Sequence, residues 1–123
     1  MRIYIGHSKD INYIDDLYKP IKELKKNINH IFLLPHDKSV ISNNDRNFYN
    51  DLDLFIAEVS MPATGLGIEL GWAYDNNIPI YCISKKGKKI SGSLKSITDK
   101  FYQYETIEEL KKIIELIIEE NKK

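Results

Sequence analysis

The sequence predicts an α/β fold in which helices cover both faces of a parallel sheet. Short apolar runs alternate along the chain with longer segments whose apolar residues recur at helical spacing. This alternation is typical of strands joined by crossover helices. The 123 residues are also a usual length for one domain with one core. We therefore expect residues 1–123 to form a single domain.

Five short apolar runs are predicted as strands. The first begins at Arg2 and leads directly from the amino terminus into Ile-Tyr-Ile, and the second stops before Pro35. The third is followed by a polar turn, and the last two are rich in isoleucine and aromatic residues, which suit strands. The predicted strands cover residues 2–6, 30–34, 52–58, 79–83 and 100–104.

Three longer segments are predicted as helices because their apolar residues share one face. The first covers residues 11–27 and the last covers residues 106–121. The middle helix is expected to begin at Thr64 or Gly65 and to end near Asn76. A short further helix is expected to begin at Asp45. Helical spacing is clearest in two sets: Ile14, Leu17, Ile21 and Leu24, and Ile107, Leu110, Ile113, Ile114 and Ile117.

The order of the strands follows from the handedness of their connections. Crossovers between parallel strands are almost always right-handed, so five such strands most simply adopt the order 2-1-3-4-5. The predicted architecture is a flavodoxin-like, Rossmann-like three-layer sandwich. Ligands bind such sheets beyond the carboxyl ends of the strands, where the strand order reverses. The loops at residues 6–8 and 58–61 are therefore expected to border one crevice.

Composition excludes several kinds of partner. Basic and acidic residues number 18 each, so the formal net charge is zero, and we expect no nucleic-acid partner. No apolar run approaches the roughly 20 residues that a membrane helix needs. No signal peptide is visible at the amino terminus. We therefore expect a cytoplasmic protein with no membrane partner.

The histidines and the one cysteine do not form a metal-binding pattern. His7, His30 and His36 lack the paired spacing of zinc sites. Cys82 lies within an apolar run, where a buried small hydrophobic residue is the simplest interpretation. We expect no metal and no cofactor.

Glu69 is the leading candidate for a functional residue. It lies in the helix after the third strand, close to the end that carries partial positive charge and points at the crevice. Gly65 and Gly67 each cost roughly 1 kcal/mol inside a helix, which suggests the close approach of a ligand or another backbone. Two plainer interpretations stay open: a solvated helix carboxylate, and glycines that pack tightly against the sheet.

Other candidates are weak when taken alone. An aspartate in the position of Asp45 more often caps a helix, and a strand tyrosine such as Tyr4 usually belongs to the core. Glu58 extends an apolar run, so it is expected to be buried, to need hydrogen-bonding partners and to act as structural support. The basic loop at residues 85–89 is interpreted as a solvated turn, with attraction of a phosphate as the alternative.

Taken together, these residues resemble a known family, the nucleoside 2-deoxyribosyltransferases. Residues 3–5 with Ser8 are similar to its opening strand and loop, Asp45 to its mid-chain acidic residue, and residues 57–71 to its signature. The 2'-deoxynucleoside 5'-monophosphate N-glycosidases are the more similar branch. The resemblance covers nearly the whole chain and runs without a gap over residues 45–83.

The resemblance implies cleavage of the N-glycosidic bond between a deoxyribose and its base. Glu69 corresponds to the nucleophile that forms a glycosyl-enzyme ester, Asp45 to the residue that helps to protonate the departing base, and Tyr4 to a tyrosine that orients the nucleophile. The chemistry agrees, because a retaining glycosidase needs a carboxylate on one face of the sugar and a proton donor at the leaving group. Transfer of the sugar to water makes a hydrolase, and transfer to a second base makes a transferase.

The resemblance also implies a small-molecule nucleoside or nucleotide substrate and a homodimer with shared sites. Residues 90–94 resemble the family segment whose serine reaches the 5'-phosphate in the neighbouring subunit, and both Ser91 and Ser93 are candidates. Ser8 belongs to the first loop, where Lys9 is a candidate substitute for the family's arginine. Gly65 and Gly67 complete the expected substrate-binding set.

Two departures from the family keep other functions open. The first loop reads His-Ser-Lys-Asp where relatives are rich in glycine, and Ala63 stands where they have a serine or an aspartate that helps to place the 5' side of the sugar. A catalytically inactive nucleotide-binding or signalling module of the same fold is therefore the alternative. Cleavage of a larger nucleotide such as NAD is a third hypothesis, without a signal of its own.

Overall fold

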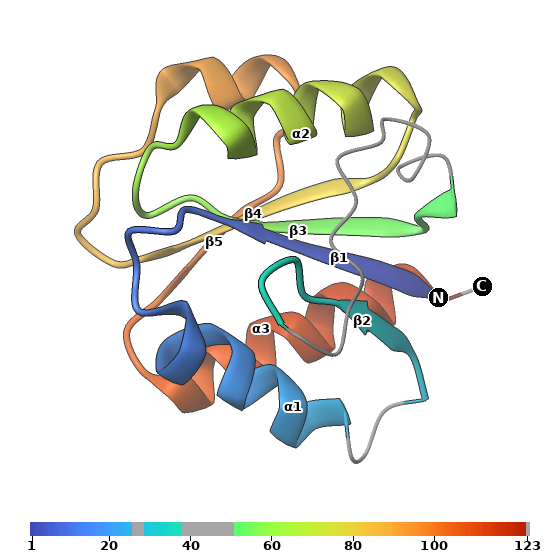
Figure 1. Cartoon of the computed structure of the whole chain (residues 1–123), viewed down its shortest axis with the longest axis vertical. Coiled ribbons are helices and arrows are strands. Elements are labelled where there is room, and N and C mark those ends of the chain that lie inside the picture. The colour runs from blue at the N-terminus through green and yellow to red at the C-terminus, as the bar shows by residue number, and fades with distance from the viewer. Residues whose placement is uncertain (26–28, 38–50, 123) are drawn as a thin grey trace.

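A computed structural model describes residues 1–25, 29–37 and 51–122 of the chain. Five parallel strands form one sheet in the order β2-β1-β3-β4-β5, as the crossover rule predicts. Helix α2 covers one face of the sheet, and α1 and α3 cover the other (Figure 1). The predicted three-layer α/β architecture is therefore confirmed.

The strands and helices lie close to their predicted positions. The strands are β1 (Arg2–His7), β2 (Ile31–Leu33), β3 (Leu54–Glu58), β4 (Ile80–Lys85) and β5 (Phe101–Tyr104). The helices are η1 (Ile14–Tyr18), α1 (Lys19–Lys25), α2 (Thr64–Asp75), η3 (Gly92–Ser96) and α3 (Ile107–Glu120). The short 3₁₀ helix η3 was not predicted, and the helix expected to begin at Asp45 lies outside the described residues.

The first helix differs most from its prediction. It begins at Ile14 instead of residue 11, with a π-helical turn, η1, that continues into α1. Pro20 gives a physical reason, because proline has no N–H to donate and its ring would clash with the carbonyl of Asp16 in a regular α-helix. A wider turn in front of the proline relieves that clash.

The other helices follow their capping signals. Thr106 precedes α3, and its side-chain oxygen accepts a hydrogen bond from the Glu109 backbone N–H at 3.1 Å. Glu109 in turn accepts the backbone N–H of Glu105 at 3.3 Å. Helix α2 ends at Asp75, and Asn77 follows in the left-handed region with φ of 59°.

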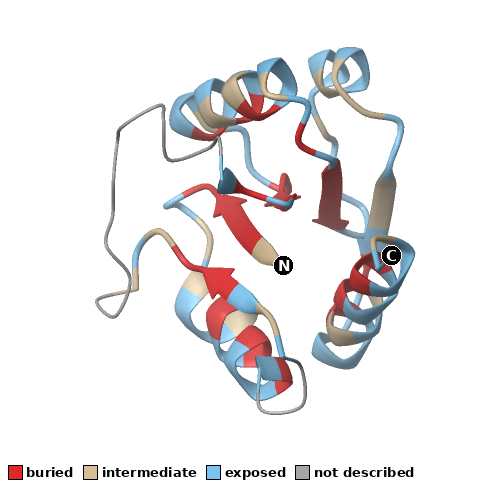
Figure 2. Cartoon of the chain, turned by 90° about the vertical axis from the view of Figure 1, so that its right-hand side faces the viewer, coloured by how far each residue is buried: buried red, intermediate tan, exposed pale blue. Residues whose placement is uncertain are grey.

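Apolar side chains fill both sides of the sheet. One buried cluster lies between the sheet and α1 and α3, and the other lies between the sheet and α2 (Figure 2). Alternate residues of β1 serve the two clusters, with Ile3 and Ile5 on the first side and Tyr4 on the second. Tyr4 therefore points toward α2, the helix that carries Glu69.

Gly6 is the glycine on which the packing of α2 against β1 depends. A Cβ atom there would lie 2.7 Å from Leu66 Cδ1 and 2.7 Å from Phe55 Cε1. We expect Gly6→Ala to lower the free energy of unfolding by about 1–3 kcal/mol, the usual cost of overpacking. Urea unfolding followed by circular dichroism measures this change.

Gly71→Ala is the matched control for that experiment, because a Cβ at Gly71 meets no described atom within 4 Å. Alanine is favoured over glycine inside a helix by about 1 kcal/mol, so the control is expected to be neutral or stabilising. Equal losses of stability in the two variants would contradict the close approach at Gly6.

Two further interpretations agree with the structure. Cys82 is buried, and burial raises the pKa of its thiol to about 12. Residues 85–89 form an exposed turn in which Lys85 and Lys86 pair with Asp16 and Glu105. Within the described part of the chain, every helix is too short or too polar to cross a bilayer.

Candidate active site

The carboxyl ends of β1 and β3 meet where the strand order reverses. His7 at the end of β1 pairs with Glu58 at the end of β3, and Glu58 pairs in turn with Ile83 of β4. β1 lies between β2 and β3, and the helices after β1 and β3 cover opposite faces of the sheet (Figure 1). This edge is where open α/β sheets bind ligands.

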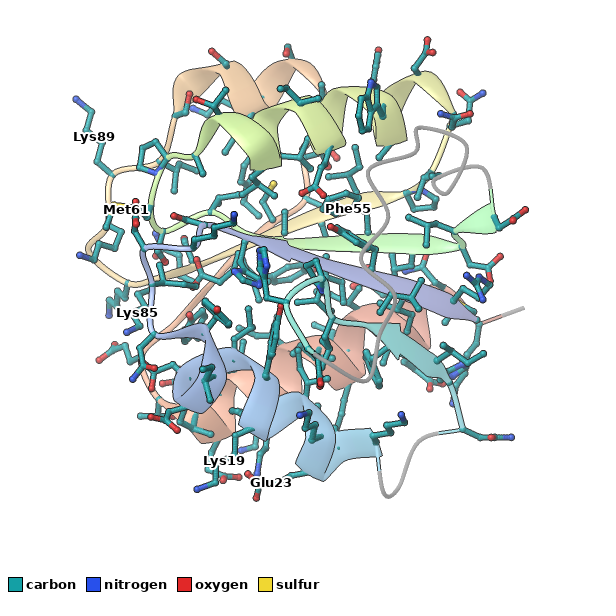
Figure 3. The ribbon with its side chains drawn as sticks, viewed as in Figure 1. Lys19, Glu23, Phe55, Met61, Lys85 and Lys89 are labelled. Carbon is teal, nitrogen blue, oxygen red and sulfur yellow. The ribbon has the colours of Figure 1, made fainter. Side chains whose placement is uncertain are left out.

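Tyr4 and Glu69 are in direct contact at this place. The Tyr4 hydroxyl donates a hydrogen bond to Glu69 Oε2 at 2.5 Å, although 65 positions separate the two residues. The ring of Tyr4 is 4% exposed and packs on Phe55, with 4.9 Å between ring centroids. The side chain of Phe55 projects from β3 toward α2 (Figure 3). The core therefore fixes the tyrosine, and the tyrosine orients the carboxylate.

Glu69 lies on the second turn of α2, with Ala63 at the N-cap. The partial charge of a helix terminus acts mainly over the first turn. The hydroxyl of Tyr4 is therefore a nearer partner for the carboxylate than the helix terminus is. Glu69 is neither buried nor fully exposed, which leaves it accessible to a ligand.

The next three site residues expected from the sequence are Asp45, Ser8 and Lys9. Asp45 lies outside the described residues. Ser8 is 2% exposed, and its hydroxyl oxygen accepts the Asp10 backbone N–H at 3.0 Å, so it closes a local turn. Lys9 is exposed beside it, and burial of the His36 ring together with the charge of Lys9 lowers the pKa of His36.

Gly65 and Gly67 are not close to any other described part of the chain. A Cβ at either position would meet no described heavy atom within 4 Å. The interpretation that they pack tightly against the sheet is therefore wrong. Both are exposed on α2, so only something outside the described chain could approach them closely.

Ser91 and Ser93 line a separate groove of about 470 Å³ between α2 and η3. Ala63, Thr64 and Gly67 line the opposite wall of this groove. Neither Glu69 nor Tyr4 is among its lining residues. Within the described part of one chain, the structure does not bring the two serines to Glu69.

Glu58 is the buried acid that the sequence predicts, with 1% exposure. It accepts the Ser60 backbone N–H at 2.6 Å, the Ser60 hydroxyl at 3.0 Å and the Tyr104 hydroxyl. Burial and the charge of Glu58 both raise the pKa of Tyr104. The Ser60 hydroxyl oxygen also accepts the Lys85 backbone N–H at 2.8 Å, so this network ties β3, β4 and β5 together where they end.

A cluster of four rings at the carboxyl ends of β1 and β2 was not foreseen from the sequence. His7 stacks on Tyr13 with centroids 4.7 Å apart, and it meets the edges of Tyr18 and His36 at 5.1 and 5.3 Å. Burial lowers the pKa of His7 and raises that of Tyr18. The signal was present, because His7 ends one parallel strand and His36 follows the next, and parallel strands end at the same edge of a sheet.

Glu69 lies within electrostatic reach of this cluster. Burial and Lys9 lower the pKa of His36, whereas Glu69 raises it. The charge of Glu69 also contributes to the raised pKa of Tyr18. No three His, Cys, Asp or Glu side chains gather as metal ligands among residues 1–25, 29–37 and 51–122. The site can thus present a fixed carboxylate, a tyrosine hydroxyl and the imidazole of His36 to a ligand.

Comparison with known proteins gives one local sequence match and several matches of the whole fold. No family model matches the chain. A putative 2'-deoxynucleoside 5'-phosphate N-hydrolase of Methanococcoides burtonii is 38% identical over 50 residues, which are 41% of this chain and 41% of the relative. The matched segment thus spans less than half of the relative's length.

The structural matches cover most of both chains. A CMP N-glycosidase from Clostridium botulinum superposes with a TM-score of 0.64 at 18% identity, over 94% of this chain and 99% of that one. A 2-deoxyribosyltransferase from Leishmania mexicana superposes with a TM-score of 0.60 at 19% identity, over 81% and 89%. A 2-deoxyribosyltransferase from Bacillus psychrosaccharolyticus also has a TM-score of 0.60, at 16% identity and with 90% of each chain covered.

The fold and the strand order are thus those of the N-glycosidases and deoxyribosyltransferases with solved structures. Over the matched 50 residues the chain is also similar in sequence to the putative 2'-deoxynucleoside 5'-phosphate N-hydrolase.

Proposed function

We propose that the protein cleaves the N-glycosidic bond of a 2'-deoxynucleoside or its 5'-monophosphate. The observation that carries the proposal is the 2.5 Å hydrogen bond from Tyr4 to Glu69 beside the carboxyl edge of β1 and β3. The names of the relatives describe hydrolysis or exchange at the same kind of bond. An oriented carboxylate is the group that this reaction needs on one face of the sugar.

In the proposed first step, Glu69 attacks the anomeric carbon and forms an ester with the sugar. The bond from that carbon to the base nitrogen breaks, and its electron pair leaves with the base. Asp45 supplies the proton that neutralises the departing base. The hydrogen bond from Tyr4 to Oε2 fixes the carboxylate, which favours attack through its other oxygen.

In the proposed second step, an acceptor displaces Glu69 from the sugar. Water gives a free sugar or sugar phosphate, and a second base gives a new nucleoside. The Asp45 carboxylate takes the proton from the acceptor, which restores the starting enzyme. Hydrolysis and exchange therefore share the first step and differ only in the acceptor.

A homodimer with shared substrate sites is part of the proposal. Ser91 and Ser93 line a groove that excludes Glu69, so a serine contact to the substrate's phosphate needs a second chain. Helix α2 presents open glycines at Gly65 and Gly67 and an Ile68 side chain that is 50% exposed, a surface suited to close packing by that chain. In the same proposal, Ser8 and Lys9 of the first loop bind the nucleotide.

The test is the release of free base, followed by liquid chromatography. The panel contains deoxynucleosides, their 5'-monophosphates and the ribonucleotide CMP, each with and without an added acceptor base. We expect turnover of at least one deoxy substrate, with a new nucleoside formed only if the enzyme is a transferase. Tight binding of a nucleotide without turnover would instead favour the inactive module that the Ala63 and first-loop departures suggest.

A further inference from the structure

The Tyr18 hydroxyl joins three segments that meet at the carboxyl ends of β1 and β2. His7 Nδ1 lies 2.8 Å from the Ser8 carbonyl oxygen, and His7 Nε2 lies 2.6 Å from the Tyr18 hydroxyl. The backbone N–H of His36 donates to the same hydroxyl oxygen at 3.0 Å. The end of β1, the turn η1 and the loop after β2 are thus joined at one oxygen atom.

The direction of each hydrogen bond follows from the partners. A carbonyl oxygen can only accept, so His7 Nδ1 carries the proton that is donated to Ser8. A neutral imidazole then accepts at Nε2, so the Tyr18 hydroxyl donates there and accepts from the His36 N–H. Burial lowers the pKa of His7, in agreement with a neutral ring. Every polar group along this chain is therefore satisfied in one arrangement.

The imidazole of His36 is the end of this arrangement that a ligand can reach. His36 is exposed, whereas His7 and Tyr18 are buried. Its ring packs at 5.3 Å from His7 and 5.5 Å from Tyr13, and its pKa responds to the charge of Glu69. Displacement by a carboxylate proceeds from the face opposite the leaving group. The His36 ring packs on His7 at the end of β1, the strand that carries Tyr4, and on Tyr13 of the α1 and α3 side of the sheet. It therefore lies on the other side of the sheet edge from α2 and Glu69, a position suited to the base.

We propose that Tyr18 is a positioning residue for the substrate, acting through His36, which contacts the base. This inference rests on the proposed N-glycosidase function. Without the hydroxyl, His7 Nε2 loses its donor and the His36 N–H loses its acceptor, so the backbone that holds the His36 ring is no longer fixed. The ring of Tyr18 packs in the core with or without the hydroxyl.

The test compares Tyr18→Phe, His36→Ala and the double variant on the substrate that the wild type turns over. We expect Tyr18→Phe to raise KM about 10-fold, which corresponds to about 1.4 kcal/mol of binding. The kcat is expected to change less than KM, because neither residue attacks the sugar. The double variant is expected to resemble His36→Ala alone, since two residues that act through one contact are not additive.

Tyr81→Phe is the matched control. The Tyr81 hydroxyl also donates one hydrogen bond, to Glu120 Oε2, and accepts one, from Asn121 Nδ2, but its partners belong to the carboxyl end of α3. Thermal unfolding of both variants reports the loss of stability. A merely structural role for Tyr18 predicts equal effects on KM in the two variants, and this result would overturn the inference.

The other possible results also distinguish between the inference and the proposed function. Unchanged KM in His36→Ala overturns the inference even if Tyr18→Phe does not fold, and additive effects in the double variant overturn the route through His36. Absence of turnover in the wild type counts against the proposed function alone. In that case calorimetric titration with a deoxynucleoside monophosphate replaces KM, and weaker binding by Tyr18→Phe than by Tyr81→Phe would still support positioning.

Discussion

The variant Glu69→Gln is expected to release base at least about 10³-fold more slowly than the wild type, the scale of loss when a nucleophile is removed. A neutral amide does not form the ester with the anomeric carbon. The amide is nearly isosteric with the carboxylate, and its oxygen can still accept the hydrogen bond from Tyr4. The fold is therefore expected to persist, with little change in thermal stability or in substrate binding.

Initial rates of base release, measured by liquid chromatography at saturating substrate, check this expectation. Glu115→Gln is the matched control, because Glu115 is exposed on α3, a helix on the opposite face of the sheet from α2. Its rate is expected to equal that of the wild type. Turnover by Glu69→Gln within a few fold of the control would refute the nucleophile assignment.

Glu58→Ala is expected to have the largest effect on stability, a loss of about 3 kcal/mol or more from the free energy of unfolding. The substitution removes the acceptor for the Ser60 N–H, the Ser60 hydroxyl and the Tyr104 hydroxyl. These donors lie in a region that water does not reach, since Ser60 and Tyr104 are both buried. The loop between β3 and α2 begins at this network, so Glu69 is expected to lose its position as well.

Urea unfolding measures the loss. Glu105→Ala is the control, because Glu105 is a half-exposed partner of Lys86 at 2.9 Å, and a surface ion pair contributes at most about 1 kcal/mol. A loss in Glu58→Ala no greater than in this control would show that the buried network does not stabilise the fold.

The fold could be predicted from the sequence because strands and helices each require a characteristic spacing of apolar residues along the chain. Apolar runs of strand length and helical spacing predicted all five strands and the three long helices, and the right-handed crossover rule then predicted the order of the sheet. The error at the first helix also has a local cause, because apolar spacing alone did not register the missing N–H of Pro20.

The candidate site could be predicted only in part. The resemblance of the signature to a family indicated Tyr4 and Glu69 together, and the structure brings their side chains into contact. Reasoning from helix propensity indicated Gly65 and Gly67 as sites of close approach, yet within the described chain the close approach is at Gly6. Propensity reports the cost of a glycine in its own helix and does not report what lies opposite.

The sequence by itself determined the fold class, the strand order and the burial of Glu58, because periodicity and apolar runs act through neighbours along the chain. Only the tertiary structure decided which distant side chains meet. It joined Tyr18 to His7 and His36, and it placed Ser91 and Ser93 in a groove that does not include Glu69. Such contacts depend on how the layers pack on the sheet, and that geometry is not encoded at any one position.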